Sequence, residues 1–134
     1  MRVVVDTNVF VSGVFFSGPP HAILDAWRNR KVQLVLSPDI LAEYQTTGNE
    51  LSAQFPNVDL NPWLELLASA AIVVQTPPLP EQVCTDPDDD KFLACALASR
   101  TKLITSGDKA LLATSGYRGV TVLTPRAFVD GHLE

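Results

Sequence analysis

Carboxylate side chains lie next to or inside several predicted elements of this 134-residue chain, and they are the residues best suited to chemistry. The acids of interest are Asp6, Glu43, the run Asp86–Asp90, and Asp108. Carboxylate oxygens are the ligands that hard divalent cations such as Mg²⁺ and Mn²⁺ prefer. Whether these acids form one site depends on where the fold places them.

Most of these acids also have an ordinary structural explanation. Asp6 and Asp108 could each cap the helix that follows, because aspartate is favoured at helix starts. Glu43 could be a solvated helix residue. In the run Asp86–Asp90, the first acid could be a cap, Pro87 suits the first helical position, and the next two acids would meet the positive end of the helix dipole.

Asp90 fits a capping role less well than its neighbours. The positions three, four and seven residues further on are Leu93, Ala94 and Leu97, all apolar, so Asp90 is predicted to head an inward-facing helical stripe. A buried carboxylate needs a partner, and the sequence supplies no obvious Lys or Arg for it. A metal ion is one physical solution.

Other chemistries have little support. Asp86, Asp88 and Asp90 have the first spacings of an EF-hand loop, but Lys91 and Leu97 stand where that loop needs Gly and Glu. No nucleophile elbow, Walker loop or dinucleotide-binding glycine motif is present. The two cysteines form no CxxC pair, which favours a reduced, cytoplasmic setting.

Strand patterns alternate with helix patterns along the chain. Apolar runs predict strands at 2–5, 32–37, 71–76, 102–106 and 120–124, and amphipathic runs predict helices near 19–29, 38–48, 61–70, 86–99, 108–114 and 125–129. Gly48-Asn49 is expected to break or bend the second of these helices. The segment Pro77–Pro80 is expected to be an extended connection.

This alternation predicts an α/β fold in which helices cover both faces of a parallel sheet, within one domain spanning residues 1–134. Ligands of such folds bind beyond the carboxyl ends of the strands. Asp6 and Asp108 follow strands, and the helices that carry Glu43 and Asp90 begin at the same edge. The four acids are therefore predicted to share one edge of the sheet.

The charge pattern limits the function classes. The formal net charge is −5 and there is no basic run, which argues against binding nucleic acid through bulk electrostatics, although bound metal ions could still attract phosphates. No apolar run is long enough to span a bilayer, so no membrane association is expected.

The motifs resemble those of PIN-domain nucleases, and among them the toxin components of bacterial toxin–antitoxin systems. The resemblance runs from Arg2 to Val129, through VVVDTNVFVSG, LSPDILAEY, DPDDDKFLACALA, LITSGDKALL and VTVLTPRAFV. It implies a three-layer α/β/α fold with a parallel five-stranded sheet of order 3-2-1-4-5. It also implies Mg²⁺- or Mn²⁺-dependent endonucleolytic cleavage of RNA, a homodimer, and a cognate antitoxin partner.

Carried onto this chain, the resemblance implies that the catalytic metal ligands are Asp6, Glu43, Asp90 and Asp108, with Asp88 or Asp89 as alternatives to Asp90. Second-shell or phosphate contacts are predicted for Asn8 and Ser106. Lys91, Lys102 and Lys109 are candidates for contact with the RNA backbone. Two other functions stay open: a PIN-type nuclease acting on DNA or structured nucleic acid, and a catalytically silent acidic binding module.

Overall fold

The computed structural model describes residues 1–133 and contains one sheet of five parallel strands. The strands are β1 (Arg2–Val5), β2 (Gln33–Leu36), β3 (Ile72–Val73), β4 (Leu103–Thr105) and β5 (Thr121–Leu123). They lie in the order β3-β2-β1-β4-β5, which confirms the predicted fold class and strand order. The central strand and its neighbour β2 are both buried, since Val3–Val5 and Leu34–Leu36 have no exposed surface.

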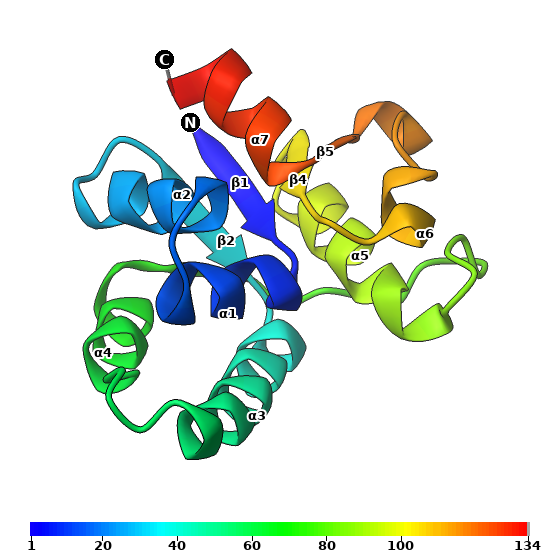
Figure 1. Cartoon of the computed structure of the whole chain (residues 1–134). Coiled ribbons are helices and arrows are strands. Elements are labelled where there is room, and N and C mark those ends of the chain that lie inside the picture. Colours follow the sequence, from blue (N-terminus) through cyan, green and yellow to red (C-terminus); the bar gives the residue numbers. More distant parts are fainter. Residues whose placement is uncertain (134) are drawn as a thin grey trace.

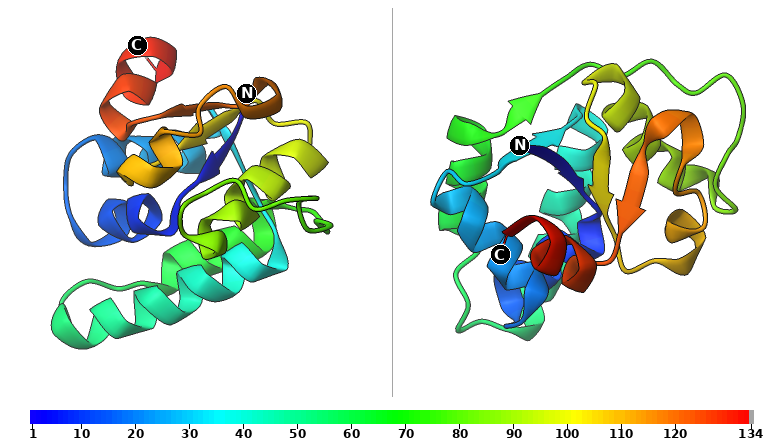
Figure 2. Two further views of the ribbon diagram at one scale, coloured as in Figure 1. Left: turned by 90° about the vertical axis from the view of Figure 1, so that its right-hand side faces the viewer. Right: turned by 90° about the horizontal axis from the view of Figure 1, so that it is seen from above.

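Helices connect the strands and enclose the sheet. The α-helices are α1 (Thr7–Phe15), α2 (Pro19–Arg28), α3 (Pro38–Gln54), α4 (Asn61–Ala70), α5 (Asp90–Ala98), α6 (Lys109–Leu112) and α7 (Pro125–Phe128). Shorter turns are the 3₁₀ segments η1 (Pro87–Asp89) and η2 (Tyr117–Gly119) and the π segment η3 (Val129–Leu133). In Figures 1 and 2, α1, α2 and α7 cover one face of the sheet and α5 covers the other, while α3 and α4 lie below the carboxyl ends of the central strands.

Two helix starts predicted from the sequence form capping hydrogen bonds in the structure. The Ser37 hydroxyl accepts a hydrogen bond from the Ile40 N–H (3.3 Å), and the Thr124 side chain accepts one from the Ala127 N–H (3.1 Å). A proline follows each of these caps directly and begins α3 or α7. The sequence therefore determines where these helices leave the sheet.

The predicted break at Gly48-Asn49 is wrong, because α3 continues through both residues to Gln54. Gly48 is buried, and a Cβ atom there would lie 2.9 Å from a methyl group of Leu60. The glycine therefore serves close packing against the segment that leads into α4, and the tertiary contact outweighs its poor helix propensity.

The predicted third strand, residues 71–76, is much shorter in the structure. Only Ile72 and Val73 pair with β2, and the Val74 N–H adds one further bond to the Leu36 carbonyl (2.9 Å). β3 is an edge strand, and the prolines that begin at Pro77 remove the N–H groups that a longer ladder would need.

Among residues 1–133, no helix combines the length and the apolar composition needed to cross a bilayer.

We predict that Gly13→Val will lower the free energy of unfolding by about 1–3 kcal/mol, measured by urea denaturation, because it overpacks the contact between α1 and α2. A Cβ atom at Gly13 would lie 2.7 Å from the Pro20 carbonyl oxygen and 2.8 Å from the Leu24 side chain. Gly131→Val is the matched control, since nothing lies within 4 Å of a Cβ built there. Equal stability of the two variants would contradict the packing argument.

Candidate active site

Asp6 occupies the carboxyl end of the central strand, and its backbone is tied to both neighbouring elements. Its N–H donates to the Thr105 carbonyl (3.0 Å), and its carbonyl accepts from the Val9 and Phe10 N–H groups of α1 (3.0 Å each). The side chain is 5% exposed and makes no capping bond to α1. The carboxylate is therefore held rigidly without being used to start the helix.

The Asp6 carboxylate is directed instead toward the end of β4. The Ser106 hydroxyl donates to Asp6 Oδ2 (2.6 Å), and Ser106 Oγ accepts from the Asp108 N–H (2.9 Å). Asn8, the other predicted second-shell residue, has an exposed side chain and contributes through its backbone N–H. Burial and the carboxylates of Asp108 and Glu43 raise the pKa of Asp6, against the lowering effect of the Ser106 and Asn8 hydrogen bonds.

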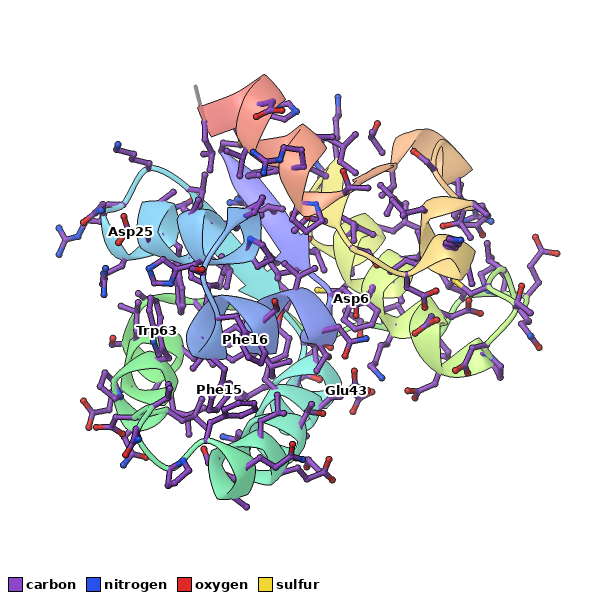
Figure 3. All side chains as sticks on the ribbon, in the orientation of Figure 1. Asp6, Phe15, Phe16, Asp25, Glu43 and Trp63 are labelled. Atoms are coloured by element: carbon purple, nitrogen blue, oxygen red, sulfur yellow. The ribbon has the colours of Figure 1, made fainter. Side chains whose placement is uncertain are left out.

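Glu43 reaches the same region from α3, as Figure 3 shows. One of its carboxylate oxygens accepts from the Thr7 hydroxyl and the other from the Lys91 ammonium group. Lys91 is only 14% exposed and also pairs with Asp88 at 2.8 Å. Lys91 thus neutralises one acid of the cluster from within the protein.

The orientation of α3, and with it the place of Glu43, depends on its neighbour Tyr44. The buried Tyr44 hydroxyl donates to the Val5 carbonyl at the end of β1, and the ring stacks on Phe10 at a centroid distance of 4.2 Å. This contact joins α3 to the strand that carries Asp6. Thr7 and Tyr44 lie within the motifs VVVDTNVFVSG and LSPDILAEY, but their specific roles depend on partners that only the fold supplies.

Asp90 has partners within the protein, and they are backbone N–H groups rather than the Lys or Arg that the sequence did not supply. Its two carboxylate oxygens accept from the backbone N–H groups of Val83 (3.0 Å) and Cys84 (2.7 Å). Burial raises the pKa of Asp90, but the Cys84 and Val83 hydrogen bonds outweigh it and hold that pKa below its usual value. Asp90 therefore ties the incoming loop to the start of α5.

The carboxylate of the neighbouring Asp89 lies near those of Asp108 and Asp6. Burial, hydrogen bonding to Asp108, and repulsion by Asp108 and Asp6 raise the pKa of Asp89 to about 7. Asp108 itself begins α6, where its Oδ1 accepts from the Ala110 N–H (2.9 Å). Near neutral pH, Asp89 therefore retains part of its proton, because burial and the neighbouring carboxylate of Asp108 disfavour its charged form.

Helical periodicity explains why the sequence alone could not show which of Asp89 and Asp90 lies toward the other acids. The positions three, four and seven residues after Asp89 are Phe92, Leu93 and Ala96, and all three are fully buried. The corresponding stripe from Asp90 is also apolar but less buried, since Leu97 is partly exposed. Both stripes look alike in the sequence, and only the packing of α5 distinguishes them.

The four acids that face one another are Asp6, Glu43, Asp89 and Asp108. Among residues 1–133, no three Asp, Glu, His or Cys side chains converge closely enough to hold a metal ion as they are placed. The donor set still fits a hard divalent cation, because every donor is a carboxylate, and burial together with their mutual repulsion raises the pKa of Asp6 and Asp89. Glu43 would first have to leave Lys91.

We predict that the metal-free protein loses stability as pH rises from about 4 to about 7. The pKa of Asp89 goes from its ordinary value of 3.8 in the unfolded chain to about 7 in the folded protein, so the folded state binds the extra proton in this window. The stabilisation that comes from protonated Asp89 is complete below a pH of about 4 and is lost above a pH of about 7. Asp89→Asn should remove this dependence and stabilise the metal-free protein at pH 8 by about 1–2 kcal/mol, after solvent screening. Urea denaturation with EDTA at both ends of the window checks this, and an unchanged pH profile in Asp89→Asn would contradict it.

Comparison with known proteins agrees with this geometry. A family model described as PIN domain matches residues 2–110, a range that includes all four facing acids. An uncharacterized protein of the archaeon Methanocaldococcus jannaschii is 36% identical over 118 residues, which cover 84% of this chain and 74% of the relative. PIN domains form a nuclease superfamily and generally use divalent metal ions. From the family match, and with acids of the expected kind at the expected edge of the sheet, the chain belongs to the PIN-domain family.

Proposed function

We propose that this protein is a metal-dependent endoribonuclease that hydrolyses RNA phosphodiester bonds, and that it acts as the toxin of a toxin–antitoxin pair. The observation that carries the nuclease proposal is the crowding of Asp6, Asp89 and Asp108 at the carboxyl edge of the sheet. Without a cation, the repulsion between these carboxylates is largely uncompensated, and a bound divalent cation would neutralise it. The toxin role, the antitoxin and the homodimer rest on the motif resemblance and stay predictions.

In this proposal, Mg²⁺ or Mn²⁺ supplies an activated water and neutralises charge on the phosphate. Asp6, Asp89 and Asp108 hold the cation, and Asp89 replaces Asp90 in the ligand set because both Asp90 oxygens are used by backbone N–H groups. Ser106 keeps the Asp6 carboxylate in place, as outer-shell groups commonly do.

Glu43 and Lys91 have linked roles in the proposal. While Glu43 is paired with Lys91, its carboxylate is unavailable as a ligand or as a base that orients water. If Glu43 served as a ligand instead, the Lys91 ammonium group would be left without this partner beside the site. It could then contact a phosphate oxygen of the substrate.

We predict that Asp6→Asn will reduce Mn²⁺-dependent RNA cleavage by at least about 100-fold, since loss of an outer-shell partner alone typically costs 10–100-fold. Cleavage of a labelled RNA with Mn²⁺, and with EDTA as a blank, measures this. Asp25→Asn is the matched control, because Asp25 is an exposed acid of α2 paired with Arg28. If Asp6→Asn folds and cleaves RNA like wild type, the proposed site is wrong.

A second prediction distinguishes Asp89 from Asp90. Mn²⁺ should raise the Tm of wild type, because a ligand that binds the native state stabilises it. Asp89→Asn should lose most of that rise. Asp90→Asn should keep it, but should be less stable without metal by about 1–3 kcal/mol because the Val83 and Cys84 N–H groups lose carboxylate acceptors.

Thermal unfolding with and without Mn²⁺ measures both effects. If Asp90→Asn lost the Mn²⁺-induced rise in Tm while Asp89→Asn kept it, Asp90 rather than Asp89 would be the metal ligand. Absence of any Mn²⁺-induced rise in wild type would favour the acidic binding module.

A further inference from the structure

A basic pocket lies at the edge of the sheet opposite the acids. It has a volume of about 430 Å³, and its walls include three cationic side chains and several apolar ones: Arg100, Lys102, Arg118, Ala96, Leu97 and Val120. Lys102 precedes β4 and Val120 precedes β5, so the pocket lies at the amino ends of strands whose carboxyl ends carry Ser106 and Asp108. No acid is among the residues that line it.

Both arginines of the pocket have backbone conformations that favour glycine. Arg100 has φ 57° and Arg118 has φ 47°, both in the left-handed region. Arg100 follows the end of α5, where its N–H donates to the Leu97 carbonyl (3.2 Å) and the Thr101 N–H donates to the Ala96 carbonyl (2.8 Å). Glycine is the usual residue at this position of such a helix end. Unfavourable conformations of this kind often accompany function, and here both arginines line the same pocket.

The cationic side chains of the basic pocket take no part in the ion pairs of the described residues. The ion pairs found among residues 1–133 join Arg28 to Asp25 and Lys91 to Glu43 and Asp88, so none involves the pocket. Arg118 lies over the Tyr117 ring, 5.4 Å from its centroid. In a chain with a formal net charge of −5, three neighbouring cations without an acid among them suit an anionic ligand.

A row of hollows leads from the basic pocket to Lys91, and the last of them is also lined by Asp39, Glu81 and Asp90. A hollow of about 280 Å³ shares Leu97 and Arg118 with the basic pocket, and it shares Ala94 and Pro77–Pro80 with a larger one of about 530 Å³. The larger hollow reaches Lys91, which pairs with Glu43. Figure 2 shows the segment between β3 and α5 passing beside α5. From Lys91 to Arg100 the row follows the helix for roughly 14 Å, at about 1.5 Å per residue.

We propose that the basic pocket binds a phosphate of the single-stranded RNA substrate, a few nucleotides away from the bond that is cleaved. This inference rests on the proposed nuclease function. A single strand fits the row because its bases are free to lie on partly exposed apolar side chains such as Leu97 and Leu79, whereas a duplex hides them. Anchoring the strand at the opposite edge offsets the repulsion between the polyanion and the acids that line the larger hollow.

The test compares the double variant Arg100→Gly/Arg118→Gly with Arg30→Gly. Arg30 is the matched control because it also has a left-handed backbone, with φ 63°, and follows the end of α2, but it lines none of these hollows. The measurement is fluorescence anisotropy of a labelled single-stranded RNA of about 10 nucleotides, in EDTA and over a range of NaCl concentrations.

The double variant should bind at least about 10-fold more weakly at low salt, and the slope of log affinity against log salt should fall by about 0.7, the value for one lost phosphate contact on a single strand. Arg30→Gly should bind like wild type. Because glycine adopts these backbone angles freely, the Tm of every variant should equal or exceed that of wild type, which separates lost binding from lost folding.

Cleavage with Mn²⁺ distinguishes failure of this inference from failure of the proposed function. The double variant should show a raised KM for the longer RNA and an unchanged kcat/KM for a dinucleotide, which is too short to reach the pocket. Wild-type affinity and KM in the double variant, with RNA cleavage intact, would overturn the inference alone. If wild type neither binds nor cleaves RNA, both proposals fail.

Discussion

The crowding of like charges at the carboxyl end of one buried strand is the constraint on which the site depends. Asp6 cannot move away, because its backbone is bonded to both β4 and α1. The acids are balanced separately: Asp6 by the Ser106 hydroxyl, Glu43 by Thr7 and Lys91, and Asp89 by the proton that its raised pKa lets it retain. Without a cation, the protein thus uses a hydroxyl, an ammonium group and a proton where positive charge is needed.

The elements around the strand can be understood as the means of holding this cluster. Tyr44 fixes α3 to β1 through the Val5 carbonyl and thereby fixes the distance between Glu43 and Asp6. The 3₁₀ turn Pro87–Asp89 and the bonds from Asp90 to Val83 and Cys84 set the phase of α5, which brings Asp89 rather than Asp90 toward Asp108. Tertiary contacts made far from the acids therefore decide which acids meet.

Local rules in the sequence were sufficient for much of the fold. The valine run predicted the central strand, Ser37-Pro38 predicted the start of α3, and the alternation of patterns predicted a parallel sheet. The strand order came from the resemblance, because local patterns do not specify which strands pair. Gly48 misled the prediction because its role is a contact with Leu60, which is distant in the sequence. The same limit applied to Asp89, Thr7 and Tyr44, whose roles depend on partners that only the folded chain supplies.

The shortness of β3 has a consequence for how copies of this protein can associate. An exposed sheet edge is a template onto which another chain can add a strand, and proteins commonly protect such edges. Here the edge strand has two residues, Ile72 and Val73, and the prolines of the Pro77–Pro80 segment lack the N–H groups that would extend it. Continuation of the sheet from one molecule into the next is disfavoured at this edge, which leaves the opposite edge strand β5, the helices or the side-chain surfaces for contacts between copies. The same feature protects the nascent chain from edge-to-edge aggregation while the rest of the sheet assembles.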